Sequence, residues 1–265
     1  MPLRIDEFIS GLTHKGSLNP AADNTKTAYR YDLERFGSFL DGREVTGEMA
    51  QQFLRRELDR GLKLSSVARY GRAIRKYLVW EGKSDEASSV LLPTPGRKLP
   101  EYHKMDTINK LIELARTPLE RAVVTILADT GFRISELLAL TADDIDWKNG
   151  LIFADRTKTN MQGWIPISQK GLDALRAYMK WAKPKGKLFP YTYHQIRNWI
   201  KELGEIAGVK VRLHMFRHSN AVISLERGED ISIIKQRLGH KNINTTMIYL
   251  QLMPQDLKKG TKGIW

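Results

Sequence analysis

Three clusters along the 265-residue chain carry side chains that could do chemistry. The first, residues 130–140, contains Arg133 and Glu136 three residues apart, a spacing that on a helix also suits an ordinary surface ion pair. The second, residues 155–159, places Lys158 in a polar turn after a predicted strand, where a lysine is usually just solvated. Each of these two clusters, taken alone, leaves the function open.

The third cluster lies near the C-terminal end of the chain and allows two different interpretations. His214 and His218 are four residues apart and could share a metal ion on one helix face, but no Glu follows His214 as it does in a zinc-protease helix. Residues 231–238, a turn at residues 239–240 and residues 244–250 have instead the spacing of a helix-turn-helix. That motif would make the protein a DNA-binding regulator without catalysis.

The charge of the chain favours a polyanionic partner, of which DNA and RNA are the commonest. The sequence contains 43 Lys and Arg against 30 Asp and Glu, a formal net charge of +13, and residues 96–265 hold +11 of it. The absence of Cys excludes a disulfide scaffold, a Cys-ligated zinc site and a thiol nucleophile. The sequence shows no run of 18 apolar residues and no signal-peptide pattern, so we expect a soluble, cytoplasmic protein without a membrane partner.

Helical periodicity dominates the first third of the chain, over residues 24–40, 47–60 and 64–80. In the last of these segments three basic side chains share one helix face, namely Arg69, Arg72 and Lys76. Such a face could follow a phosphate backbone, although a solvated helix face has the same spacing.

A stretch with Pro93, Pro95 and Gly96 predicts an extended linker over residues 84–99. We therefore predict a helical N-terminal domain over residues 1–95 and a second domain over residues 96–265.

The second domain combines helical patterns with two short apolar runs. The helical patterns lie near residues 105–116, 118–129, 169–182, 192–207, 214–227, 230–238 and 243–252. The runs at 151–154 and 164–167 predict strands, and Pro166 suits the second strand to a sheet edge. The predicted fold class is mainly α with a small β-sheet, the second domain being α+β.

Taken together and in chain order, the clusters resemble the tyrosine recombinase (phage integrase) family, with a Xer-like domain arrangement. Arg133 lies in a Gly-x-Arg-Ile-Ser-Glu-Leu-Leu segment that is similar to the family's first arginine box. A His-x-x-Arg-His motif begins at residue 214, and a Leu-Gly-His motif precedes Tyr249 by nine residues, as in the family's later boxes. Lys158 lies where the family's lysine stands on a hairpin. The resemblance identifies six catalytic candidates: Arg133, Lys158, His214, Arg217, His240 and Tyr249.

The resemblance implies a site-specific DNA recombinase that cleaves and rejoins strands, as in integration, excision or dimer resolution. Tyr249 would be the nucleophile, forming a 3′-phosphotyrosyl link and leaving a free 5′ hydroxyl. Arg133 and Arg217 suit the phosphate, because a guanidinium fork binds its oxygens bidentately and is never deprotonated. Since the exchange conserves bond energy, no cofactor and no metal are expected.

The remaining candidates have proton-transfer or supporting roles in this interpretation. Lys158 would protonate the leaving 5′ oxygen, as the family's lysine does. His214 and His240 would accept the phenol proton or bind a phosphate oxygen. Glu136 would support Arg133 or Lys158, and we expect His218, which flanks the box, to have only a structural role.

The resemblance also predicts the partners. The expected partner is double-stranded DNA with inverted-repeat sites, bound by a homotetramer that acts through a Holliday junction in the cytoplasm, in association with the nucleoid. The helical N-terminal domain would be a core-binding domain that contacts DNA partly through Arg69, Arg72 and Lys76. Two alternatives remain: a type IB topoisomerase, which uses the same residue types without a defined site, and the helix-turn-helix regulator.

Overall fold

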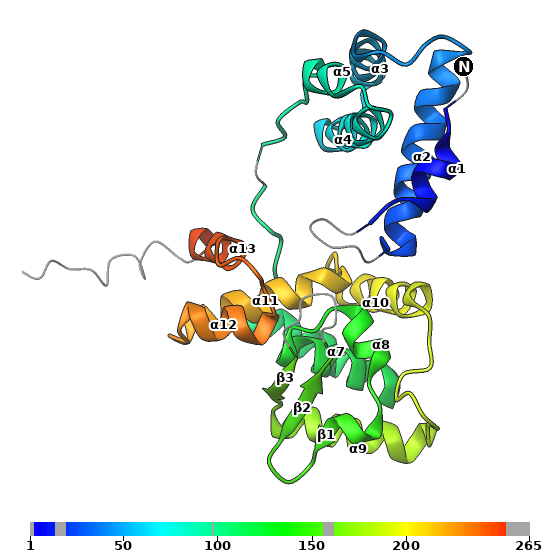
Figure 1. The fold of residues 1–265 in the computed structure, drawn as a ribbon. Coiled ribbons are helices and arrows are strands. Elements are labelled where there is room, and N and C mark those ends of the chain that lie inside the picture. The colour runs from blue at the N-terminus through cyan, green and yellow to red at the C-terminus, as the bar shows by residue number, and fades with distance from the viewer. Residues whose placement is uncertain (1–2, 14–19, 97, 156–161, 253–265) are drawn as a thin grey trace, which may run out of the picture. The chain divides into compact units, whose positions relative to one another are not determined.

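The computed structural model of the protein describes residues 3–13, 20–96, 98–155 and 162–252 (Figure 1). The chain divides into two compact units, Met1–Arg97 and Lys98–Trp265, and each unit buries an apolar core of its own. Both are mainly helical, and the second also contains a small antiparallel sheet, so the predicted fold class is confirmed. None of the described helices has both the length and the apolar character that crossing a membrane requires.

Helices build the described part of the first unit: α1 (Ile5–Ser10), α2 (Asp23–Leu40), α3 (Gly47–Asp59), α4 (Leu64–Trp80) and α5 (Ser84–Ser89). The helices predicted over residues 24–40, 47–60 and 64–80 are confirmed as α2, α3 and α4. Their apolar stripes meet in one core, in which Phe36 and Phe53 are fully buried. The short α1, which the periodicity did not predict, adds its own apolar side chains to this core.

The first part of the predicted linker is helical, and this corrects the expectation of an extended connection over residues 84–99. Ser84–Ser89 form α5, which buries Ala87 in the core of the first unit. The carboxylate of Glu86 accepts a hydrogen bond of 2.5 Å from the N–H of Gly47, at the start of α3. A Cβ atom at Gly47 would lie 2.6 Å from the carbonyl oxygen of Glu86, so this close approach requires glycine. The contact is distant in sequence, which is why local composition did not predict the helix.

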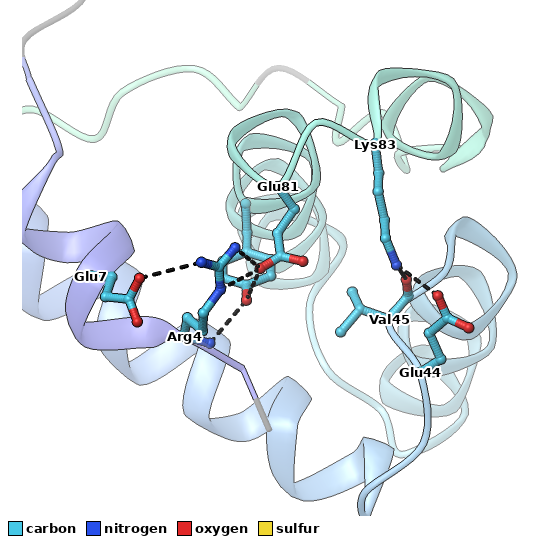
Figure 2. A network of polar contacts seen from close by, with 7 residues as sticks. Arg4, Glu7, Glu44, Val45, Glu81 and Lys83 are labelled. Carbon is cyan, nitrogen blue, oxygen red and sulfur yellow. Dashed lines mark hydrogen bonds and ion pairs between the residues drawn. The ribbon is translucent and has the colours of Figure 1, made fainter. Parts of the chain in front are cut away.

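Polar contacts around the end of α4 fasten other segments of the first unit to it (Figure 2). Nε and Nη2 of Arg4 donate to Oε1 of Glu81 at 3.2 and 3.1 Å, and the hydroxyl of Tyr77 donates to the same oxygen at 2.9 Å. Lys83 donates to the carboxylate of Glu44 at 2.9 Å. Because these charged groups lie at the surface, water screens the ion pairs, which serve mainly to fix the ends of the helices.

The described part of the second unit contains helices, two short 3₁₀ segments and three strands. In chain order they are α6 (Met105–Glu113), α7 (Pro118–Thr130), α8 (Ile134–Ala139), η1 (Ala142–Asp144), β1 (Ile145–Asp146), β2 (Leu151–Ala154), β3 (Gly163–Pro166), α9 (Gln169–Ala182), α10 (Tyr193–Ala207), α11 (Leu213–Glu226), α12 (Ile231–Leu238), α13 (Asn244–Met247) and η2 (Ile248–Leu252). The strands pair in the order β1-β2-β3, with Ile152 opposite Ile165. The prediction that Pro166 marks an edge strand is confirmed, because β3 is the last strand of the described sheet.

Helix α7 lies at the centre of the second unit's core. Thr117 caps its N-terminus by accepting a hydrogen bond from the N–H of Glu120, and Pro118 occupies the first helical position. Ile126 and Leu127 are fully buried where α7 packs against α6, α9 and α11. The C-terminal end of α7 is therefore held rigidly, and it leads directly into the segment that contains the first arginine candidate.

Candidate active site

Arg217 is the most deeply buried of the candidate residues, with 1% of its surface exposed on α11. Its Nη1 donates a hydrogen bond of 2.9 Å to the carbonyl of Gly131, and its Nη2 donates to the carbonyl of Leu238. These carbonyls end α7 and α12, where helices carry carbonyl groups without helical partners. The two bonds fix the guanidinium, and because carbonyl oxygens are neutral they do not cancel its charge.

Two glycines end these helices and bring the candidate residues that follow them into place. Gly131 and Gly239 both have φ of +64°, the left-handed conformation that favours glycine at a helix C-terminus. A Cβ atom at Gly131 would lie 2.6 Å from the side chain of Leu238. The close approach of the two helix ends thus requires glycine, and it places Arg133 and His240 just beyond the carbonyls that Arg217 binds.

Arg133 caps the start of α8 and is held by Glu136 from the first turn of that helix. Nη1 of Arg133 donates to Oε1 of Glu136 at 2.7 Å, and the backbone N–H of Arg133 donates to Oε2 at 3.0 Å. The carboxylate is buried at 8% exposure, whereas 35% of the arginine side chain remains exposed. Glu136 therefore orients a guanidinium that an outside anion can still reach.

The nucleophile candidate meets two histidines. Tyr249 lies in η2 with only 2% of its surface exposed, and its Oη is 2.9 Å from Nδ1 of His218. The rings of His218 and His214, one turn apart on α11, meet edge to face with centroids 4.6 Å apart. The ring of His240 stacks on Tyr249 with a centroid distance of 6.4 Å, while its Nδ1 lies 2.8 Å from Oγ1 of Thr246.

Burial and the two arginines set the protonation of this group. Burial raises the pKa of Tyr249, and the nearby charges of Arg217 and Arg133 act in the opposite direction. Burial, with Arg217 and Arg133, lowers the pKa of His214. The pKa of His218 falls to about 4, through burial first and then through His214 and Arg217. At neutral pH both imidazoles on α11 are therefore uncharged, and the phenol is protonated.

The structure thus places five of the six catalytic candidates in one region of the second unit: Arg133, His214, Arg217, His240 and Tyr249. Lys158 lies outside the described residues. We expected His218 to have only a structural role, yet its ring is the one that contacts the phenol hydroxyl. The spacing of His214 and His218 places both on one face of a helix, but it does not indicate which segment meets that face. In the part of the chain that the structure describes, no three His, Asp or Glu residues are grouped as metal ligands.

The predicted DNA-contacting residues on α4 differ in how they are held. Nη1 of Arg69 lies 2.5 Å from Oδ1 of Asp32, a carboxylate on α2 that is 2% exposed. Burial raises the pKa of Asp32 to about 6, against the opposing effect of Arg69. Lys76 is exposed, with its Nζ 5.4 Å from the ring centroid of Tyr29. Arg72 is exposed and makes no ion pair with any described residue, so it and Lys76 are the more available cations.

The helix-turn-helix interpretation fits the structure poorly. Residues 231–238 do form α12, and Gly239 ends it, but the next helix, Asn244–Met247, spans a single turn and continues as the 3₁₀ segment η2. Tyr249, in the supposed recognition helix, points into the protein. This segment is too short to enter a DNA groove as a recognition helix.

Comparison with known proteins places both units. Residues 102–256 match the Phage integrase family, and residues 5–82 match the phage integrase N-terminal SAM-like domain. Tyrosine recombinase XerA of Pyrococcus furiosus is 32% identical over 273 residues, which cover 97% of this chain and 92% of the relative. Tyrosine recombinase XerD of Pseudomonas aeruginosa is 29% identical, covering 94% of this chain and 92% of the relative. The chain therefore belongs to the phage integrase family.

Solved structures share the fold at lower identity. XerH site-specific recombinase bound to difH substrate in a pre-cleavage complex superposes with a TM-score of 0.76 at 19% identity, covering 98% of this chain and 94% of that one. A lambda integrase dimer bound to a COC′ core site gives 0.75 at 15% identity, covering 92% and 93%. The prediction of a tyrosine-type site-specific recombinase is confirmed by the family relationship, and the topoisomerase and regulator alternatives are not favoured.

Proposed function

We propose that this recombinase cleaves and rejoins DNA strands through a 3′-phosphotyrosyl link to Tyr249, leaving a free 5′ hydroxyl at each cut. The observation that supports this most strongly is the meeting of Arg217, Arg133 and Tyr249, which come from three separate segments of the second unit. The phosphotyrosyl bond conserves the energy of the broken phosphodiester. The exchange therefore proceeds without a nucleotide cofactor and without a metal.

The arginines bind the scissile phosphate in this proposal. Displacement at phosphorus adds negative charge to the non-bridging oxygens, and preorganised cations stabilise that charge most where water is excluded. Arg217 is fixed by carbonyl groups that leave its charge in place. Arg133 is oriented by Glu136 and half-exposed, so it faces the incoming DNA. The two guanidinium groups thus form a positively charged binding site for one phosphate.

The neighbouring polar residues complete the reaction. His214, at the start of α11, is partly exposed and neutral, so it donates a hydrogen bond to a phosphate oxygen without repelling the arginines. His240 stacks on the tyrosine ring and contributes a second hydrogen bond to the phosphate. Lys158 protonates the leaving 5′ oxygen, a task that suits an ammonium group placed within hydrogen-bond reach.

The first unit supplies the rest of the DNA contact. We assign the core-binding domain to residues 1–95 and the catalytic domain to residues 96–265. Arg72 and Lys76 on α4 contact phosphates, whereas Arg69 is partly committed to Asp32. Four protomers then act on two sites, each an inverted repeat, through a Holliday junction in nucleoid-associated DNA.

Covalent capture tests this proposal directly. The protein is incubated with fragmented DNA of its host and denatured, and the DNA that remains attached to protein is sequenced at its ends. Tyr249→Phe must abolish capture, and Tyr193→Phe, at an exposed tyrosine of α10, is the matched control that retains it. Adducts at 3′ ends on a recurring inverted repeat support the proposal.

Two other outcomes contradict it. Adducts scattered over many sequences favour a topoisomerase. Salt-sensitive DNA binding with no adduct from the wild-type protein favours a regulator without catalysis.

A further inference from the structure

The hydroxyl of Tyr249 makes one hydrogen bond among the described residues, and its partner is His218. The distance from Nδ1 to Oη is 2.9 Å, within the normal range for a hydrogen bond. The other ring beside the tyrosine, that of His240, has its Nδ1 directed to Oγ1 of Thr246 instead. His218 is therefore the histidine whose ring nitrogen touches the reacting oxygen.

We propose that His218 is a positioning residue for the nucleophile, which holds the hydroxyl of Tyr249 in the free protein and accepts its proton when a phosphate is bound. The inference rests on the proposed role of Tyr249 and extends it. It requires the tautomer of His218 with hydrogen on Nε2, so that Nδ1 accepts the O–H of the phenol.

Oη of Tyr249 forms a bond to phosphorus while its proton moves to Nδ1 of His218. The bond from phosphorus to the 5′ oxygen breaks, and that oxygen takes a proton from Lys158. In rejoining, the 5′ hydroxyl attacks the phosphotyrosine and returns its proton to Lys158, and the departing Oη recovers its own from His218.

The surroundings of His218 keep this transfer from occurring before DNA arrives. His214 and Arg217 act on the ring from its own helix, and Tyr249 faces it from η2. Arg133 and His240 lie beside Tyr249. Burial, His214 and Arg217 hold the imidazole pKa at about 4, and burial raises that of the phenol.

In the free protein the proton therefore stays on Tyr249. A phosphate bound between the two arginines adds negative charge, which favours the imidazolium. The substrate itself thus makes His218 a competent base.

Histidine NMR of the full chain without DNA tests the contact independently of activity. With ¹⁵N-labelled histidine we expect one ring to stay neutral below pH 5 and to carry its proton on Nε2. Its Nδ1 resonance should shift in Tyr249→Phe, because that variant removes the hydroxyl and keeps the ring. An unchanged resonance, or a proton on Nδ1 in the neutral form, overturns the proposal.

Single-turnover adduct formation tests the function of the contact, on a duplex carrying the site found by covalent capture. An Asn side chain places a polar atom near the position of Nδ1, whereas Phe keeps only the ring. We expect His218→Phe to slow adduct formation about 100-fold and His218→Asn about 10-fold. The wild-type rate should fall at low pH as the imidazole is protonated in the complex, and both variants should lack this dependence.

Controls keep this experiment decisive. His194→Asn, at an exposed histidine on α10, should match the wild-type protein in rate and pH profile. A wild-type rate and profile in His218→Asn, or a loss in His218→Phe that only follows its thermal unfolding, overturns the proposal. If the wild-type protein forms no adduct at all, the proposed function fails, while the NMR result still decides whether His218 holds the hydroxyl.

Discussion

Arg69 and Arg35 of the first unit and Arg217 of the second unit are held by different kinds of partner. In the first unit Arg69 pairs with the buried carboxylate of Asp32, and Arg35 pairs at 2.7 Å with Glu57, which is fully buried. In the second unit the buried Arg217 donates to two backbone carbonyls. A carboxylate cancels the charge of its arginine, whereas a carbonyl only orients it. The first arrangement joins helices of the bundle, and the second holds a guanidinium between the ends of α7 and α12.

The kind of partner also affects how much free energy it costs to bury an arginine. Removing a cation from water is costly, and neutral acceptors recover less of that cost than a carboxylate does. The two carbonyl bonds of Arg217 therefore orient its guanidinium without placing a negative charge on it. Arg133 is intermediate between the two arrangements, because Glu136 pairs with it but leaves part of the guanidinium exposed.

The largest effect is expected from Arg217→Ala. The substitution leaves the carbonyls of Gly131 and Leu238 without their donor and removes the buried cation. We expect adduct formation to fall about 10³-fold and the free energy of unfolding to fall by about 2–4 kcal/mol. Single-turnover capture and urea unfolding measure the two effects. Arg176→Ala, at an exposed arginine of α9, should change neither, and an active Arg217→Ala protein would contradict the contrast between the units.

Removing one buried carboxylate from each unit should separate an effect on the reaction from an effect on stability. Glu136→Gln frees Arg133, so adduct formation should slow about 10- to 100-fold with little loss of stability. Glu57→Gln leaves Arg35 without its counter-ion, so the free energy of unfolding should fall by about 1–3 kcal/mol. The adduct rate of the folded Glu57→Gln protein should not change. If Glu57→Gln slowed adduct formation and Glu136→Gln lowered the free energy of unfolding, the roles assigned to these two carboxylates would be wrong.

A smaller effect concerns the pH dependence of stability. Burial raises the pKa of Asp32 to about 6, above its ordinary value of 3.8, so the folded state binds more protons than the unfolded state between these values. The contribution of Asp32 to stability therefore falls as pH rises from about 4 to 7, by up to about 3 kcal/mol. Urea unfolding should show that the free energy of unfolding of Asp32→Asn, relative to that of the wild-type protein, is higher at pH 7.5 than at pH 4.5. If this difference is the same at both pH values, the pKa of Asp32 is not raised in the folded protein.

The smallest effects are expected on the exposed face of α4. Arg72→Ala and Lys76→Ala should each weaken binding to a duplex of random sequence several-fold and reduce the slope of log affinity against log salt by about 0.9. Fluorescence anisotropy over a range of salt concentrations measures this. Arg69→Ala should change the slope less and the stability more, because it removes the partner of Asp32. If every variant kept the wild-type slope of log affinity against log salt, α4 would not contact the DNA.

Sequence predicted the elements that depend on local pattern. The apolar periodicity located α2, α3 and α4, Pro166 marked the edge strand, and the ordered boxes identified Arg133, Arg217 and Tyr249 as candidates. It missed α5, whose stability depends on the distant contact of Glu86 with Gly47. It also missed the contact of His218 with Tyr249, because nothing in the spacing of residues 31 apart indicates that η2 returns to α11.

The bridge made by Arg217 joins parts of the chain that are far apart in sequence. One of its carbonyl partners lies 86 residues before it and the other 21 residues after it. A chain still emerging from the ribosome, or one broken before residue 238, has the first half of the bridge but not the second. The guanidinium is therefore held on both sides only once α12 has been made and has packed against α11.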